Sequence, residues 1–347
     1  MSKKYLVTLR PLENYFFGGE ITFGQDKGTQ NYFVKSNLYP QQTTLLGTIR
    51  FQLLKNNGLL PLNDNKKLTT KNLIGLHSFD IDKDFSFGAI LNLSPLFMIN
   101  GDDRYCFAPK YKNISFVESD GKMFTNKQRA FVPIIKGYDA KEHYHPDLLQ
   151  KESDNNCTVP FDNVFKIAEQ IGISKNNKGE TDENAFFRQE YYRLAENWKF
   201  AFVVELSGKF DDDNKDVKFE NDIVTMGGEN SKFEMKIKPI NENFEQLFHI
   251  KTSKNNAVIL MSDAIVENSV YDHCKFAITE TADLRYIKTE TNSKRSYSDE
   301  PSKSKKINLL KRGSILFPDD FDKFSEMLSI KKYQKAGFNI FKTVSTL

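Results

Sequence analysis

Residues 232–238 read Lys-Phe-Glu-Met-Lys-Ile-Lys (KFEMKIK), which is the clearest strand pattern in the chain. Apolar and charged side chains alternate strictly, and this is the period of a strand with one buried face. We therefore expect Phe233, Met235 and Ile237 to point into a core while the charged side chains face solvent. The fold must contain a sheet that is covered on one side.

A helix is predicted upstream of this strand, at residues 41–57. Leu45, Ile49 and Leu53 recur every four residues and make one apolar face, and Gly58 follows as a natural helix stop. The other helices expected from apolar periodicity are residues 186–197, 241–249 and 319–330. The other expected strands are residues 4–9, 95–100, 104–108, 199–206, 257–261, 275–279, 314–317 and 338–344.

Strands and helices thus alternate with short connections and antiparallel hairpins, which indicates an α+β fold with helices packed on sheets. The ferredoxin-like, or RRM-like, βαββαβ unit fits both halves of the chain. We predict two such domains with loop insertions. The first covers residues 1–195 with an insertion around 110–180, and the second covers residues 196–347 with a flexible loop at 289–306.

Composition narrows the functional class. The 347 residues carry 49 Lys and Arg against 46 Asp and Glu, a net charge of only +3. The three cysteines lack a CxxC spacing, so neither a disulfide framework nor a four-cysteine zinc site is expected. No apolar run has the length of a signal-peptide core or a membrane span. We expect a cytoplasmic protein without a membrane partner.

The basic charge is concentrated near the end of the chain. Residues 291–347 hold twelve Lys and Arg and six Asp and Glu, so this segment has a net charge of +6 and the remainder −3. A local basic region on a nearly neutral body can hold a polyanion. A solvated lysine-rich loop explains the same composition.

Two sets of residues raise the question of catalysis. Asp102 and Asp103 lie in an Asn-Gly-Asp-Asp turn between two predicted strands, a position at which some enzymes hold two metal ions. A third carboxylate would be needed, and Asp80 and Asp82 are the nearby candidates. His77 could act as a general base, but no nucleophile or carboxylate pattern accompanies it. An ordinary turn and a structural histidine are the favoured interpretations.

Other polar motifs have weaker signals. His143 and His145 could present two imidazoles to a metal, although Pro146 suggests an exposed loop. His249 and His273 are isolated. No metal or cofactor is expected.

Two glycine motifs could approach a nucleic acid. Gly227 and Gly228 allow close approach of the backbone to phosphates, and Gly337 lies between a cation and an aromatic ring, Lys335 and Phe338. Taken singly, each motif is more simply a turn.

The motifs in their order along the chain resemble the RAMP superfamily of CRISPR effector subunits. The likeness is carried by LRPLENYFFGGEITF (9–23), SNLYPQQTTLLGTIRFQLL (36–54), MGGENSKFEM (226–235), KRGSILF (311–317) and KAGFNIF (335–341). Within that superfamily the chain is most similar to the family of the third Cmr subunit of type III-B complexes.

This resemblance implies a non-catalytic subunit. Such proteins bind the repeat-derived 5′ tag of the CRISPR RNA and join a large polymerase-cyclase subunit to the backbone RAMP subunits, meeting target RNA only indirectly. The positions to which the resemblance and the glycine motifs assign RNA binding are Ser36, Gln42, Thr43, Gly47, Arg50, Gly227, Gly228, Glu229, Lys335, Gly337 and Phe338.

Three alternatives remain open from the sequence. The chain could be the equivalent subunit of a type III-A complex. It could be an enzyme, either a RAMP-type RNA-processing ribonuclease using His77 or a metal-dependent nucleotidyl enzyme using Asp102 and Asp103. It could also be a purely structural subunit without RNA contact.

Overall fold

The fold was analysed in a computed structural model. It describes residues 2–18, 33–62, 64–83, 86–108, 114–119, 130–135, 148–154, 157–175, 178–210, 215–241, 257–289 and 302–344. Residues 242–249 of the expected helix and the histidines at 143, 145 and 249 lie outside these residues, as do residues 290–301 of the expected flexible loop.

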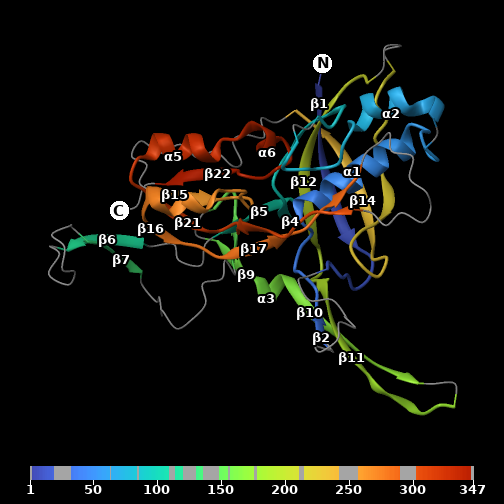
Figure 1. The fold of residues 1–347 in the computed structure, drawn as a ribbon, viewed down its shortest axis with the longest axis horizontal. Helices are drawn as coiled ribbons and strands as arrows, with labels where there is room; N and C mark the ends of the chain where they lie inside the picture. Colours follow the sequence, from blue (N-terminus) through green and yellow to red (C-terminus); the bar gives the residue numbers. More distant parts are fainter. Residues whose placement is uncertain are drawn as a thin grey trace.

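A large sheet forms the first half of the molecule (Figure 1). Its strand order is β13-β14-β1-β12-β4-β5-β8-β9, and β3 pairs with β12 beside β4. The strands are β1 (Ser2–Pro11), β3 (Ile90–Leu93), β4 (Phe97–Asn100), β5 (Asp103–Ala108), β8 (Leu148–Lys151), β9 (Thr158–Pro160), β12 (Trp198–Ser207), β13 (Asp222–Thr225) and β14 (Lys232–Ile240). The strand predicted at residues 232–238 is β14, and its Phe233 and Met235 are completely buried as predicted.

A second sheet is built from the C-terminal part, in the order β16-β21-β15-β22. These strands are β15 (Ala257–Leu260), β16 (Cys274–Ile278), β21 (Ile315–Pro318) and β22 (Phe341–Val344). Every pair in this sheet is antiparallel.

Three two-stranded ladders are separate from these sheets. They are β17 (Thr281–Leu284) with β20 (Ile307–Leu310), β18 (Ile287–Lys288) with β19 (Ser302–Lys303), and β6 (Ile114–Ser119) with β7 (Ala130–Ile135). Strand β18 therefore directly precedes the expected loop at 289–306, and β19 lies within it.

Two of the helices cover the outer faces of the two large sheets. The predicted first helix is confirmed as α1 (Gln42–Asn56), whose Leu45, Ile49 and Leu53 are fully buried in the core under the first sheet. The remaining helices are η1 (Asp64–Lys66), α2 (Lys67–Ile74), α3 (Phe161–Val164), η2 (Asn268–His273), α5 (Phe321–Leu328) and α6 (Lys331–Lys335). The N-cap of α5 is Asp320, whose side chain accepts the Lys323 backbone N–H.

The two sheets pack face to face, which gives four layers. Phe97 and Val203 of the first sheet share an apolar cluster with Ile259 and Phe317 of the second. The opposite face of the second sheet packs on α5 through Phe324. The order is α1, first sheet, second sheet, α5, so the predicted α+β class is confirmed.

One predicted element is wrong. Residues 186–197 form no helix. Residues 186–194 belong to β11 (Thr181–Leu194), which pairs with β10 (Phe165–Lys175) in a long hairpin that extends away from the body (Figure 1). The third strand of this sheet is β2 (Phe33–Lys35). Phe187 and Tyr191 are four residues apart, a spacing shared by one face of a helix and one face of a strand. Pairing with β10 decides between them.

The first sheet continues past residue 195, the expected domain boundary. Strands β12, β13 and β14 follow that residue, yet they belong to the first sheet, and β12 is hydrogen-bonded along β1. The second sheet starts at Ala257, so the first sheet extends as far as Ile240. Strand β1 is hydrogen-bonded on both sides, and its two partners, β12 and β14, both come from later in the chain.

Candidate nucleic-acid interface

The segment Tyr15–Phe17 brings two of the predicted motifs together. Phe16 bridges Gly228, and Phe17 bridges Asn37. The Ser36 hydroxyl accepts the Phe17 backbone N–H at 2.8 Å and is itself 3% exposed. Ser36 and the Gly-Gly loop therefore lie on opposite sides of one extended segment, although some 190 residues separate them in the sequence.

The Gly-Gly loop has a packing role in this arrangement. Gly227 has a φ of +75°, and a Cβ there would overlap the Phe16 carbonyl oxygen, so only glycine fits. The Gly228 N–H donates to that same oxygen at 2.8 Å. This N–H is therefore already used within the protein and does not form part of a phosphate cradle.

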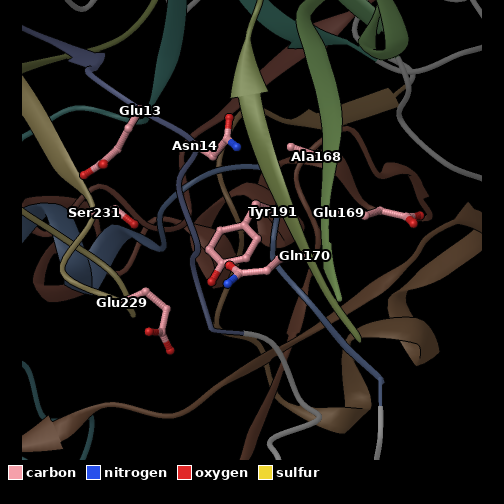
Figure 2. Close-up of a pocket in the computed structure, with 8 residues that line it drawn as sticks. All are labelled: Glu13, Asn14, Ala168, Glu169, Gln170, Tyr191, Glu229 and Ser231. Carbon is pink, nitrogen blue, oxygen red and sulfur yellow. The ribbon is translucent and has the colours of Figure 1, made fainter. Parts of the chain in front are cut away.

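A cavity of about 360 Å³ opens beside this loop (Figure 2). Glu229, which is exposed with a φ of +56°, lines it together with Tyr191 of β11. Burial, and then the negative charge of Glu229, raise the pKa of the Tyr191 hydroxyl. The lining is completed by Glu13, Asn14, Ala168, Glu169, Gln170 and Ser231. These groups can accept hydrogen bonds and offer a ring for stacking, but they provide no positive charge.

A second group of predicted residues gathers where α1 begins. Gln42 is 1% exposed, and its Nε2 donates to the Ser94 carbonyl oxygen at 2.7 Å. Gly337, with a φ of +83°, lies so close that a Cβ there would stand 2.7 Å from Gln42 Cδ and 2.8 Å from the Ser94 oxygen. The structure thus joins the first and last of the predicted motifs.

Arg50 lies two turns further along α1. The residue is 8% exposed, its Nε is buried without a hydrogen-bond partner, and no ion pair to it is found among the described residues. Burial alone lowers the pKa of its guanidinium to about 10, so the charge persists at neutral pH. Gly47, one turn earlier, is exposed, and no heavy atom lies within 4 Å of where its Cβ would stand. Thr43 is half-buried on the preceding turn.

The C-terminal pair of predicted residues divides between surface and core. Lys335 is exposed at the end of α6. Phe338 is 1% exposed, and its ring centroid lies 5.2 Å from that of Phe79. In this structure Phe338 is a core side chain, and its burial does not favour stacking on a base.

Many basic residues near the end of the chain have partners inside the protein. Lys306 pairs with Asp283, and Lys311 pairs with Glu280 at 2.9 Å. Lys332 Nζ donates to the Ile81 carbonyl oxygen at 3.0 Å. The basic segment seen in the sequence is therefore partly neutralised in the fold.

The candidate catalytic residues do not converge. Asp80 accepts the Tyr286 hydroxyl at 3.0 Å and pairs with Lys288, and Asp103 pairs with Lys151 at 2.8 Å. Within the described parts of the chain, no group of three or more His, Cys, Asp or Glu side chains could hold a metal ion. Asp80 and Asp82 thus do not complete a carboxylate set with Asp102 and Asp103.

Sequence reasoning missed a charged side chain that is completely buried in the part of the chain that the structure describes. Arg312 is 0% exposed and forms an ion pair with Asp263, and its guanidinium faces Tyr39. It was counted only as part of a basic segment. The signal that could have found it is its place within KRGSILF, where an apolar strand follows directly.

Comparisons with known proteins agree with this picture. The Cas_Cmr3 family of CRISPR-associated proteins matches residues 7–125 and 110–341. The chain therefore belongs to the Cas_Cmr3 family, as the sequence motifs indicated. No curated protein matches the sequence.

Two chains of solved type III-B structures share this fold. Chains of the type III-B Cmr-beta complex, one bound to cognate target RNA and AMPPnP and one bound to cognate target RNA, each match with a TM-score of 0.50 and 12% identity. The matches cover 98% and 99% of this chain and 99% of each matched chain. A chain of the Csm3-Csm4 subcomplex of a type III-A complex matches with a TM-score of 0.35 and 12% identity, over 91% of this chain and 93% of that one.

No helix in the described part of the protein is long and apolar enough to span a membrane.

Proposed function

We propose that this protein is a non-catalytic subunit of a type III-B CRISPR interference complex. It binds the 5′ tag of the CRISPR RNA and bridges the large polymerase-cyclase subunit to the backbone RAMP subunits in the cytoplasm. The family match supports this proposal, and it favours type III-B over the type III-A alternative. The observation that carries the RNA-binding part is the buried and unpaired Arg50.

An unpaired guanidinium in a buried position is costly unless a partner of opposite charge reaches it. Side chains on a helix lean toward its N-terminus, so the Arg50 side chain is directed along α1 toward the turn before it. Because Gly47 has no side chain and open space above it, an anion can approach Arg50 there. A phosphate of the RNA backbone supplies the missing charge, and Arg binds phosphate oxygens through several N–H groups at once.

The cavity beside the Gly-Gly loop supports a different contact. Its carboxylates repel phosphates, but Glu229 can accept hydrogen bonds from the amino group of an unstacked base, and Tyr191 offers a ring. Phosphates would then bind at α1, while a base edge would enter the cavity of Figure 2. In this proposal Gly227 and Ser36 shape the cavity wall without contacting RNA themselves.

The strand orders support two ferredoxin-like units. In chain order, the strands of the second sheet are β15, β16, β21 and β22, and their spatial order is fourth, first, third, second. The central strands of the first sheet, β14-β1-β12-β4, have the same order, with all neighbours antiparallel. Helices α5 and α6 occupy the second crossover of the C-terminal unit, and α1 and α2 occupy the first crossover of the N-terminal unit.

The β10–β11 hairpin supports the bridging role. Ile167, Ile171 and Ile173 all project from one face of β10 and are 59%, 60% and 54% exposed. Phe186 of β11, opposite Ile173, is 48% exposed. These side chains form an apolar stripe that the Glu169–Arg188 ion pair interrupts. Exposed apolar side chains on a projecting hairpin are typical of a protein–protein contact, so this face is proposed to meet a backbone subunit.

Substitution of Arg50 tests the RNA-binding proposal. Arg50→Met removes the unpaired charge, so affinity for single-stranded tag RNA should fall and the slope of log K against log salt should become shallower by about 0.7. The melting temperature should hold or rise, because an uncompensated buried cation is lost. Lys275→Met, at an exposed position on β16, is the matched control. Unchanged affinity and slope in the Arg50 variant would disprove the assignment.

A further inference from the structure

Arg312 is held by one carboxylate and two rings. It lies in the turn between β20 and β21, where its backbone N–H and Nε donate to Asp263 Oδ1 at 2.9 and 3.1 Å. Its Nη2 donates to Oδ2 at 3.0 Å. Burial opposes ionisation of Asp263, but the charge and hydrogen bonds of Arg312 hold the pKa of that carboxyl below its usual value. The pair stays charged inside the protein.

The remaining face of the guanidinium meets the first half of the molecule. Its Cζ lies 4.6 Å from the Tyr39 ring centroid and 5.0 Å from that of Phe107 on β5. The two ring centroids are 4.8 Å apart. Nη1 is buried without a hydrogen-bond partner, and contact with two π faces is the compensation that the structure offers it.

Tyr39 belongs to a link that leads directly into α1. The Tyr15 hydroxyl donates to the Leu38 carbonyl oxygen at 2.8 Å, which fixes this link to the first sheet. From the C-terminal part, the Asp283 carbonyl oxygen accepts Gln41 Nε2 at 2.9 Å, and Gly337 packs against Gln42. The start of α1 is therefore held by three separate C-terminal segments.

These contacts replace an ordinary helix cap. The N-cap residue Gln41 makes no side-chain capping bond, and the first turn of α1 contains no acidic residue. A helix start without a cap is defined by whatever contacts its flanking residues. Here those contacts come from Arg312, Asp283 and Gly337.

We propose that Arg312 is a positioning residue that, paired with Asp263, fixes Tyr39 and through it the residue 36–43 segment. The second sheet thereby sets the geometry of the α1 surface that binds RNA. This inference rests on the proposed RNA-binding function of α1. A subunit whose second sheet was displaced would lose the RNA site without losing any residue that contacts RNA.

The test compares Arg312→Lys with Leu328→Ala in the full chain. Lysine keeps the charge but loses the two-pronged contact with Asp263 and the flat face on the rings. Leu328 is fully buried on α5, on the far side of the second sheet. Its truncation therefore lowers stability without changing the contacts of Arg312 with Asp263 and Tyr39. Affinity for single-stranded tag RNA, measured well below both melting temperatures, should fall by about tenfold in Arg312→Lys only.

Hydrogen exchange gives a readout that does not depend on RNA. The backbone amides of residues 36–43 should exchange faster in Arg312→Lys, and not in Leu328→Ala beyond its global loss of stability. Tyr39→Leu should reproduce both effects, and the double variant should add little to either single change. Tyr39→Phe keeps the ring and should resemble the unsubstituted protein.

The outcomes distinguish the positioning role of Arg312 from the proposed RNA-binding function. Equal losses of RNA affinity in Arg312→Lys and Leu328→Ala, at equal losses of stability, would overturn the inference. Unchanged hydrogen exchange over residues 36–43 in Arg312→Lys would also overturn the inference. If the unsubstituted chain binds no RNA while Arg312→Lys still speeds exchange there, the proposed function fails and the positioning of residues 36–43 by Arg312 stands.

Discussion

Gly337 occupies a site where the backbone conformation and the available space both require glycine. Its φ is +83°, and a Cβ would collide with the Gln42 amide and the Ser94 carbonyl oxygen. We expect Gly337→Ala to lower stability by about 2–3 kcal/mol, since it adds steric overlap to the strain of a left-handed residue. Thermal and urea unfolding measure this loss.

Gly101→Ala is the matched control for that substitution. Gly101 has a φ of +62°, but nothing lies within 4 Å of the position of its Cβ. It should therefore cost only about 1 kcal/mol, the strain alone. Equal losses at the two sites would show that the contact with Gln42 contributes nothing.

Asp263 gives the protein a defined response to acid. Its folded-state pKa lies below the unfolded value because Arg312 outweighs the effect of burial. A depressed carboxyl pKa contributes stability above the unfolded value of about 3.9, and this contribution is lost as pH falls through the folded value. Asp263→Asn leaves Arg312 buried and unpaired, so it should cost about 3–5 kcal/mol near pH 7.

The pH dependence of that difference is the measurement. The melting temperatures of the unsubstituted protein and of Asp263→Asn should differ most at neutral pH. They should converge below about pH 4, where the unsubstituted protein loses the stability that the charged carboxylate contributes. A difference that stayed constant down to pH 3 would mean that Asp263 is not ionised in the folded state.

At the scale of elements, the β10–β11 hairpin illustrates how a strand can imitate a helix in sequence. Residues 186–197 carry aromatic side chains at spacings that a helix also presents, and only the distant partner β10 settles their conformation. By contrast, the helix at 42–56 and the strand at 232–240 were predictable, because the period of each pattern is unambiguous and its boundaries carry Gly or charged residues.

The apolar stripe of this hairpin yields a prediction about assembly. Ile171→Asp should leave the melting temperature of the isolated chain nearly unchanged, because the side chain is 60% exposed. It should impair incorporation into the complex, since a charge would replace apolar contact area in the interface. Co-purification with the other subunits measures this effect. Ile287→Asp, 51% exposed on β18, is the control, and equal incorporation of both variants would contradict the assignment.

At the scale of the whole molecule, the pairing of strands that lie far apart in the sequence determines the architecture, and local sequence patterns do not predict this pairing. β1 pairs with β12 and β14, some 200 residues later, so the first sheet closes only after the expected domain boundary has passed. The predicted site residues also depend on such pairing. Ser36 meets the Gly227 loop through Phe16 and Phe17. The contacts of Arg312 with Asp263 and Tyr39 could not be predicted locally, because the sequence shows only one charged residue before a strand.

The same pairing changes how the basic segment can act. Of the lysines and arginines after residue 291, Lys306, Lys311 and Arg312 have acidic partners within the chain. Lys331 and Lys335 are exposed at the two ends of α6, next to Gly337 and the start of α1. These two residues are therefore the better candidates for phosphate contacts in this segment.

The salt dependence of RNA binding distinguishes exposed lysines from paired ones. If Lys331 and Lys335 each contact one phosphate, replacing both by Ala should make the slope of log K against log salt shallower by about 1.4, because each phosphate contact contributes about 0.7 for a single strand. Replacing Lys306 and Lys311 by Met should leave the slope unchanged and lower only the melting temperature, since their charges are already matched by Asp283 and Glu280. An unchanged slope in the first variant would mean that α6 faces solvent or another subunit, and that Arg50 and its neighbours on α1 bind the phosphates without it.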